Sequence, residues 1–345
     1  MHYDEEPRKI EPGEILQRLR CDNGGFQQDF AQTQVPNPLG RAKKEQIAQR
    51  AVCSFIVVLH DEEPCAIITD KAKKSTEQAK SQHFSAFICY NIICKQSKTE
   101  GVQMQAIKTT ELVKRYKNIT AVDKLDLEIR QGELFSLLGV NGAGKTTTLK
   151  MLSCLTMPTG GDAFVGGYSI TKESRQVKRL IGVSPQETAV APNLSVKENL
   201  ELICGIHGFS KEKAQAKITE LSERLGLDTV LQRKAGKLSG GWQRRVSIAM
   251  ALISEPQILF LDEPSLGLDV IARHELWQTI RSLKGKITII LTTHYMEEAE
   301  ALSDRIGIMK SGRLLAIGTS EELIKKAGTT DFEAAFVSIV KGGAV

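Results

Sequence analysis

The 345-residue chain carries a formal net charge of +5, and 41% of its residues are hydrophobic and 25% charged. These fractions are typical of globular proteins, so the chain can bury a sizeable core. The small positive charge gives no electrostatic footprint for nucleic acid, and we expect no nucleic-acid partner. The longest apolar runs fall far short of the roughly 18 residues that a spanning helix needs, so any membrane role is expected to come through a partner.

The first 103 residues differ in pattern from the rest of the chain, being acidic and polar at the start and Gln-rich around Gln27–Gln34. Cys53–Leu59 and Phe84–Cys94 could be strands, and Lys71–Lys80 could be a helix. The seven cysteines of the whole chain lack paired CxxC spacing and follow no secretory signal, so we expect reduced thiols. Without a phosphate loop, metal spacing or catalytic constellation, residues 1–103 are treated as an N-terminal extension of unknown role, with partial disorder expected.

After this extension the apolar residues follow clear periods. Leu125, Leu127 and Ile129 alternate with polar residues, which predicts a half-buried strand. Leu134–Leu138 is an apolar run of strand length, and a glycine-rich loop leads from it into a helix that begins near Lys145. The sequence therefore predicts a strand, a loop and a helix in direct succession.

The middle of the chain is predicted to be helical. Ser195 and Glu198 have the spacing of a capping box ahead of an apolar stretch. The Lys-rich segment Ser210–Leu225 has the character of a helix that ends at Gly226. A further helical run is expected at Gln243–Ile253.

The later part of the chain returns to strands. Ile258–Leu261 and Ile287–Leu291 are short apolar runs, as strands buried on both faces should be. Arg305–Met309 and Arg313–Ile317 flank the turn residues Lys310 to Gly312, which predicts a β-hairpin. Strands that alternate with helices predict an α/β fold.

The segment GVNGAGKT has the spacing G-x-x-x-x-G-K-[ST] of a phosphate-binding loop. Its glycines let successive backbone N–H groups face a polyphosphate, and the following helix adds its positive end. Lys145 supplies a cation for the β and γ phosphates, and the Thr146 hydroxyl can ligate Mg²⁺. The residues expected to contact the nucleotide here are Gly139, Val140, Asn141, Gly142, Ala143, Gly144, Lys145, Thr146 and Thr147.

Two carboxylates, Asp262 and Glu263, directly follow the predicted strand Ile258–Leu261. Asp262 suits contact with Mg²⁺ through water, and Glu263 suits a general base for the attacking water. A charged strand end without a chemical role is the alternative, and taken alone it is equally open.

The segment LSGGW contains a second candidate anion site. Ser239 could cap the following helix, and the N–H groups of Gly240 and Gly241 would be exposed to an anion. A simple helix cap is the alternative. The position of the segment between the phosphate loop and Asp262 favours the anion site.

Residues 104–318 resemble the nucleotide-binding subunit of ATP-binding cassette (ABC) transporters, and LSGGW is similar to that family's signature motif. The resemblance implies a P-loop NTPase cassette with a mixed core sheet, an antiparallel β part and a helical subdomain at about 187–240. The nucleotide-binding domain would span 104–320 and be followed by a C-terminal tail at 321–345. ATP and Mg²⁺ are the implied cofactors.

The resemblance also implies roles for four residues outside these motifs. Tyr116, in KRYKNITAV, is similar to the aromatic residue on which adenine stacks, with a core tyrosine as the alternative. Gln186, in GVSPQE, resembles the glutamine that senses Mg²⁺ and contacts the transporter. Asp269, in SLGLD, resembles the aspartate that works across the dimer. His294, in ILTTHYMEEAE, resembles the switch histidine that contacts the γ phosphate, although a lone histidine after a strand is more often satisfied by neighbours.

One residue departs from the family pattern, because Trp242 stands where many members have glutamine. The phosphate contacts should come from Ser239 and from backbone N–H groups, so Trp242 should alter only the rim of the site. The resemblance implies Glu263, His294 and Gln186 as catalytic residues. It implies Thr146, Gln186 and Asp262 as the residues that hold Mg²⁺.

Each motif occurs once, and the resemblance implies that the signature of one cassette closes over nucleotide held by the phosphate loop of another. One chain would then have half of each ATP site and work as a homo- or heterodimer with a second cassette subunit. The stretch TTHYMEEAEALSDRIGIMKSGRLLAIGT, with the late DFEAAF, resembles the branch that serves exporters of drugs, polysaccharides and similar cargo. The permease would be a separate integral membrane chain, contacted around residues 186–208. This chain would then lie at the cytoplasmic face of the cell membrane.

Two alternatives remain. A soluble cassette ATPase could act mechanically or in regulation, but translation-type cassettes are usually duplicated and chromosome-type ones carry long coiled coils between loop and signature. Here Lys145 and Ser239 are only 94 positions apart. A GTPase or small-molecule kinase would leave LSGGW and His294 unexplained. Since the segment from Met104 already resembles a complete cassette, we expect residues 1–103 to be dispensable for activity.

Overall fold

The computed structural model describes residues 105–342, and the strands and helix expected within the first 103 residues lie outside this range. The described chain divides into two compact units. The first consists of residues 105–182, 257–263 and 280–342, and we call it the phosphate-loop unit. The second consists of residues 183–256 and 264–279, and we call it the signature unit.

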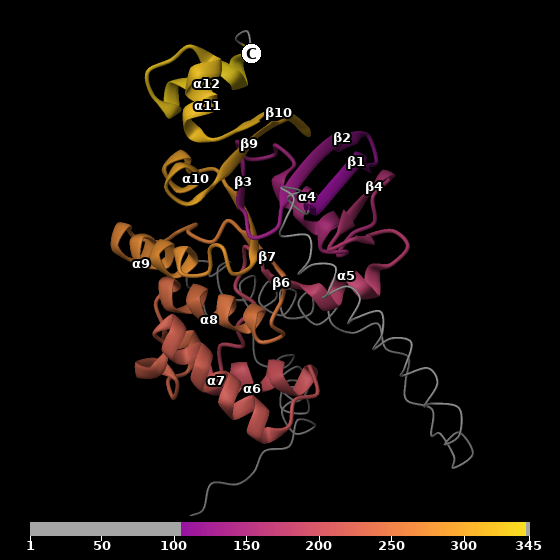
Figure 1. The fold of residues 1–345 in the computed structure, drawn as a ribbon. Helices are drawn as coiled ribbons and strands as arrows, with labels where there is room; N and C mark the ends of the chain where they lie inside the picture. The colour runs from indigo at the N-terminus through magenta and orange to yellow at the C-terminus, as the bar shows by residue number, and fades with distance from the viewer. Residues whose placement is uncertain (1–104, 343–345) are drawn as a thin grey trace, which may run out of the picture. The chain divides into compact units, whose positions relative to one another are not determined.

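The phosphate-loop unit begins with an antiparallel sheet in the order β2-β1-β4-β5, drawn in indigo to magenta in Figure 1. Its strands are β1 (Gln105–Tyr116), β2 (Ile119–Arg130), β4 (Gly160–Val165) and β5 (Tyr168–Ser169). The predicted alternation in β2 is confirmed, because Leu125, Leu127 and Ile129 are buried between exposed neighbours. This burial of one face fixes the register of the strand.

The larger sheet has the order β10-β9-β3-β8-β7-β6. Its strands are β3 (Leu134–Leu138), β6 (Ile181–Ser184), β7 (Ile258–Asp262), β8 (Thr288–Thr293), β9 (Arg305–Lys310) and β10 (Arg313–Gly318). Neighbours from β9 to β7 pair in parallel and β10 is antiparallel to β9, so the expected mixed sheet is confirmed. All residues of β3, β7 and β8 are buried, as predicted for strands covered on both faces.

The helices of the phosphate-loop unit follow its strands. They are α4 (Lys145–Leu152), α5 (Ser174–Leu180), α10 (Met296–Leu302), α11 (Ser320–Ala327) and α12 (Phe332–Lys341). The predicted succession of strand, loop and helix is confirmed by β3 and α4. The predicted hairpin is β9 and β10, and its turn residues Ser311 and Gly312 both have positive φ, as a tight two-residue hairpin requires.

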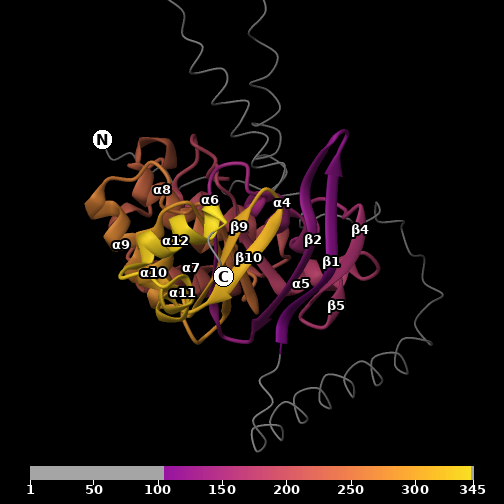
Figure 2. The same cartoon turned by 90° about the horizontal axis from the view of Figure 1, so that it is seen from above.

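The segment expected to be a C-terminal tail contains the folded helices α11 and α12. A capping box formed by Thr319 and Glu322 starts α11. Leu323 of α11 and Phe332 of α12 are buried in one apolar cluster with residues of β3, α10, β9 and β10. Figures 1 and 2 show the two helices, in yellow, beside α10 and β9. Helices α11 and α12 therefore pack onto the core of this unit through their buried apolar residues.

The signature unit is helical, as predicted. Its elements are α6 (Val196–Ile206), α7 (Lys211–Leu225), α8 (Gly240–Leu252), the start of α9 (Val270–Arg281) and two short 3₁₀ turns at Asp228–Val230 and Ala235–Lys237. The capping box of Ser195 and Glu198 and the end of α7 at Gly226 are confirmed. The unit extends beyond the predicted 187–240 because α8 packs against α6 and α7. Within residues 105–342, none of the helices combines the length and apolarity needed to cross a membrane.

Candidate functional site

The glycine-rich loop joins β3 to α4 along a path that only glycine allows at key positions. Gly142 and Gly144 have φ angles of 81° and 105°, which residues with a Cβ rarely adopt. A Cβ at Gly144 would lie 2.5 Å from the carbonyl oxygen of Ala121, and one at Gly139 would clash with the carbonyl oxygen of Met309. The loop therefore depends on its glycines both for backbone conformation and for space.

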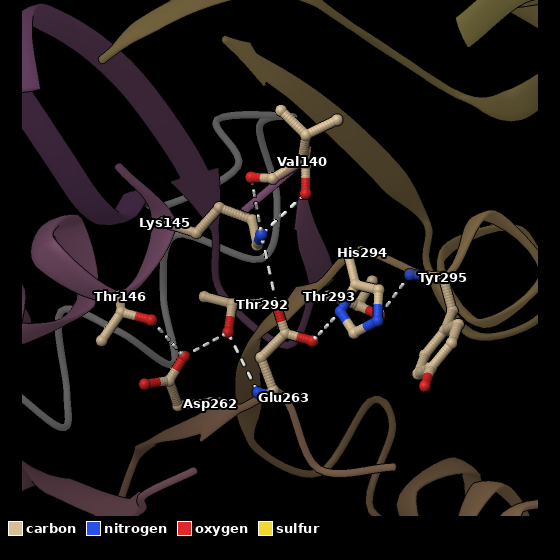
Figure 3. Close-up of polar contacts among 10 residues, drawn as sticks. Val140, Lys145, Thr146, Asp262, Glu263, Thr292, Thr293, His294 and Tyr295 are labelled. Carbon is tan, nitrogen blue, oxygen red and sulfur yellow. Dashed lines mark hydrogen bonds and ion pairs between the residues drawn. The ribbon is translucent and has the colours of Figure 1, made fainter. Parts of the chain in front are cut away.

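Lys145 is buried at the first turn of α4 and directs its ammonium back across the loop (Figure 3). Its Nζ donates to the carbonyl oxygens of Gly139, over 2.7 Å, and of Val140, over 3.3 Å. The same Nζ lies 3.2 Å from Oε1 of Glu263. Because a buried cation needs a compensating charge, Glu263 is the ionic partner of Lys145 in this structure.

Asp262, the last residue of β7, accepts two hydroxyl hydrogen bonds on one oxygen (Figure 3). Thr146 Oγ1 donates to its Oδ1 over 3.0 Å, and Thr292 Oγ1 donates over 2.5 Å. Burial raises the pKa of Asp262, and these two hydrogen bonds oppose the rise. An adjacent hydroxyl and carboxylate are the hard oxygen donors that Mg²⁺ prefers, so Thr146 and Asp262 fit a magnesium site.

Glu263 follows Asp262 in a left-handed backbone conformation, with a φ of 49°. Its N–H donates to both the carbonyl oxygen and the Oγ1 of Thr292, at 3.1 Å in each case. Its Oε2 lies 2.6 Å from Nδ1 of His294, while Oε1 faces Lys145. A buried carboxylate fixed at both oxygens and at its backbone can accept a proton from a water molecule held beside it.

Known proteins resemble this chain in sequence. The family model described as ABC transporter matches residues 122–266. Over 224 residues the chain is 41% identical to the daunorubicin resistance ATP-binding protein DrrA3 of Streptomyces coeruleorubidus. The match covers 65% of this chain and 71% of that protein. The chain belongs to the ABC transporter family. It is also 42% identical over 217 residues to the Nod factor export ATP-binding protein I of Burkholderia pseudomallei, and the match covers 62% of this chain and 71% of that protein.

Solved structures of ABC cassettes share the fold. The structure of an ATP-binding subunit of an ABC transporter aligns with a TM-score of 0.61 and 27% identity, covering 68% of this chain and 99% of the other. A dimeric ATP-binding cassette in a post-hydrolysis state, bound to ADP and Pi, aligns with a TM-score of 0.56 and 27% identity, covering 62% and 98%. The fold predicted from the sequence, an ATP-binding cassette, is therefore confirmed.

The signature segment of this cassette differs from its prediction in detail. Helix α8 begins at Gly240 rather than near Gln243, because the N–H of Gln243 already donates to the carbonyl oxygen of Ser239. Ser239 is the N-cap residue, as expected, although its hydroxyl makes no capping hydrogen bond. Ser239 and Gly240 are exposed, whereas Gly241 is buried against α9. Of the three residues expected to be exposed to an anion, only Ser239 and Gly240 are exposed.

Trp242 lies in the first turn of this helix and is half-buried. The guanidinium of Arg245 is 4.8 Å from the centre of its ring, and the Nη2 of Arg245 is 2.6 Å from Oε2 of Glu275. The indole is therefore held by a side chain of its own helix and, through it, by α9. Ser239 and Gly240 stay exposed beside it.

Three further predicted residues, Tyr116, Gln186 and Asp269, are found at exposed positions. Tyr116, at the end of β1, is 44% exposed, so the alternative of a core tyrosine is wrong. The ammonium of Lys114 lies 5.0 Å from the centre of its ring. Gln186 and Asp269 are exposed in the signature unit, and Oδ1 of Asp269 accepts a hydrogen bond from the N–H of Ala272 at the start of α9.

The structure thus brings five of the predicted residues into one hydrogen-bonded group within the phosphate-loop unit. They are Lys145, Thr146, Asp262, Glu263 and His294. Ser239, Gly240, Gly241, Gln186 and Asp269 belong to the signature unit.

Two residues that the sequence analysis did not select take part in these arrangements. Thr292 bonds to both Asp262 and Glu263, and its place at the end of an apolar strand next to β7 is the signal that could have found it. Arg244 is buried, and its guanidinium donates to the carbonyl oxygens of Pro185 and Gln186, at 2.7 Å each. Arg244 therefore joins the Gln186 loop to α8 inside the signature unit, a contact that no local pattern announces.

Proposed function

We propose that this chain is the ATP-hydrolysing subunit that powers a separate membrane permease for export. The observation that carries hydrolysis is the Glu263 carboxylate, fixed between Lys145 and His294 and directly following Asp262. Export is supported by two relatives, one a daunorubicin resistance ATP-binding protein and the other a Nod factor export ATP-binding protein.

The residues of the phosphate-loop unit divide the chemistry among them. Backbone N–H groups of the loop and the ammonium of Lys145 bind the β and γ phosphates of ATP. Thr146 and Asp262 would hold Mg²⁺, with Gln186 as a further contact, and the ion supplies positive charge to the phosphates. Glu263 takes a proton from the attacking water.

Two further residues complete this half of the site. His294 bonds to the carboxylate of Glu263 over 2.6 Å and would contact the γ phosphate. The exposed ring of Tyr116 would stack on adenine.

The residues of the signature unit would serve the ATP of another cassette. Ser239 and Gly240 are exposed at the start of α8, where backbone N–H groups favour an anion. Asp269 is exposed at the start of α9 and would act across the same interface. A second cassette subunit, identical or related, is therefore the proposed partner. A relative of known structure is described as dimeric.

ATP-driven closure of two cassettes and their separation after hydrolysis would move the attached permease. The contact with that permease is proposed around residues 186–208, which include the Gln186 loop held by Arg244 and the helix α6. The chain would then lie at the cytoplasmic face of the cell membrane, bound through the permease.

Purification of the tagged full chain from solubilised membranes of its native cells tests this proposal. We expect a multi-span membrane protein to co-purify with the chain, and we expect ATPase activity that Glu263→Gln abolishes. ATP hydrolysis by a chain that brings down no multi-span protein would instead favour a cassette ATPase that works without a permease.

A further inference from the structure

Thr292 lies at the end of β8 with no exposed surface, yet its hydroxyl contacts both carboxylate residues of the site (Figure 3). Its Oγ1 donates to Oδ1 of Asp262 over 2.5 Å. The same oxygen accepts the backbone N–H of Glu263 over 3.1 Å. One side chain therefore bonds to the residue that fits Mg²⁺ and to the residue that fits the general base.

The direction of these two hydrogen bonds is fixed by chemistry. A hydroxyl has a single proton, and the backbone N–H of Glu263 can only donate. The oxygen of Thr292 must therefore accept from Glu263 and use its one proton toward Asp262. The hydroxyl thus sets the distance between the backbone of one carboxylate residue and the side chain of the next.

The backbone of Glu263 needs such support. Its φ of 49° is in the left-handed region, which is unfavourable for a residue with a Cβ and persists only where the surroundings enforce it. Its N–H is held twice by Thr292, through the carbonyl oxygen and through Oγ1. Loss of Oγ1 would leave the carbonyl bond, so the N–H would stay satisfied while the side-chain restraint disappears.

We propose that Thr292 is a positioning residue for ATP hydrolysis, whose hydroxyl aligns Asp262 for Mg²⁺ and Glu263 for water at the same time. This inference rests on the proposed function of the site. The competing role is that of an ordinary buried strand residue, for which only the shape of the side chain matters.

The variant Thr292→Val keeps the shape and removes the hydroxyl, whereas Thr292→Ser keeps the hydroxyl and removes the methyl group. Thr288→Val is the matched control. Thr288 is a buried threonine on the same strand, and its Oγ1 accepts the N–H of Gly132 at the other end of β8. All three variants are made in the full chain.

Two measurements are made on each variant. Steady-state ATPase assays give kcat and KM, and isothermal titration calorimetry gives the affinity for ATP with Mg²⁺ and with EDTA. For Thr292→Val we expect kcat to fall about 10- to 100-fold, the effect of losing a hydrogen bond to a charged group. We expect the gain in ATP affinity that Mg²⁺ brings to shrink, and the affinity in EDTA to be unchanged. Thr292→Ser should restore kcat to within about threefold of wild type, and Thr288→Val should match wild type.

Wild-type kcat and wild-type Mg²⁺ response in Thr292→Val would overturn the inference. So would a Thr292→Ser variant as impaired as Thr292→Val, or a Thr288→Val variant with the same loss. Failure of the proposed function itself is recognised separately, because Glu263→Gln would then hydrolyse ATP at the wild-type rate.

Discussion

The two units present their predicted residues in opposite ways. Lys145, Asp262 and Glu263 of the phosphate-loop unit are each only 5% exposed and are bonded to residues of the same unit. Ser239 and Asp269 of the signature unit are exposed. The first set is a bonded group within one unit, because charges that are buried must be paired within the chain. The second set is open to contact from outside the chain, which agrees with our proposal that these residues serve the ATP of another cassette.

Replacement of Glu263, the proposed general base, should give the largest effect. Glu263→Gln keeps the shape of the side chain but cannot take a proton from water, so kcat should fall about 10²- to 10⁴-fold while ATP still binds. Phosphate release and calorimetry measure the two quantities. Glu111→Gln, which changes an exposed carboxylate of β1, is the control and should leave kcat unchanged. Wild-type turnover in Glu263→Gln would remove the general base from our account.

Loss of the buried cation should act on binding. Lys145→Ala removes a charged donor to phosphate, worth about 1.5–3 kcal/mol, so the affinity for ATP should fall about 10- to 100-fold. Calorimetry measures it, with the exposed Lys172→Ala of the same unit as the control. An unchanged affinity in Lys145→Ala would mean that the ammonium serves only to pair Glu263.

A change in the signature unit should leave a single chain able to bind ATP. Ser239→Arg alters an exposed residue, so the unfolding temperature and the ATP affinity of one chain should stay at wild-type values. The ATPase rate should fall about 10- to 100-fold, because a charged phosphate of the other cassette loses its hydroxyl contact. A loss of ATP affinity in the isolated chain would break the contrast between the two units.

The smallest effect is expected at Trp242. Trp242→Gln removes the stacking with Arg245, worth about 0.5–1 kcal/mol, and so should slightly lower the unfolding temperature. The ATPase rate should stay within about threefold of wild type, because Ser239 and backbone N–H groups supply the phosphate contacts. A larger loss of turnover would show that the indole itself contacts the other cassette or its nucleotide.

The parts of the molecule that could be predicted from sequence are those with local signals. The phosphate loop consists of eight consecutive residues, from Gly139 to Thr146, and their order predicts both the turn and the ligand contacts. The buried strands β7 and β8 were evident because continuous apolar runs of that length are typical of parallel sheets. Their carboxyl ends place Asp262 and His294 at one edge of the sheet.

The parts that escaped prediction depend on distant partners. Thr292 contacts Asp262 and Arg244 contacts Pro185, both far away in sequence. Neither a threonine nor an arginine predicts such a contact by its type alone. Residues 321–345 were expected as a C-terminal tail, without the helices α11 and α12. Short helices gain most of their stability from tertiary packing, which the sequence does not show. The capping box of Thr319 and Glu322 was nevertheless a local signal for the start of α11.

Our central claim is that each chain supplies the phosphate loop of one ATP site and the signature segment of another. The mass of the Glu263→Gln variant in solution tests this claim most directly. Size-exclusion chromatography with light scattering would measure that mass with and without ATP and Mg²⁺. Our account predicts that ATP doubles the mass of Glu263→Gln and that adding Ser239→Arg to the same chain prevents the doubling. A chain that binds ATP and keeps its single mass, or a doubling that survives Ser239→Arg, would contradict it.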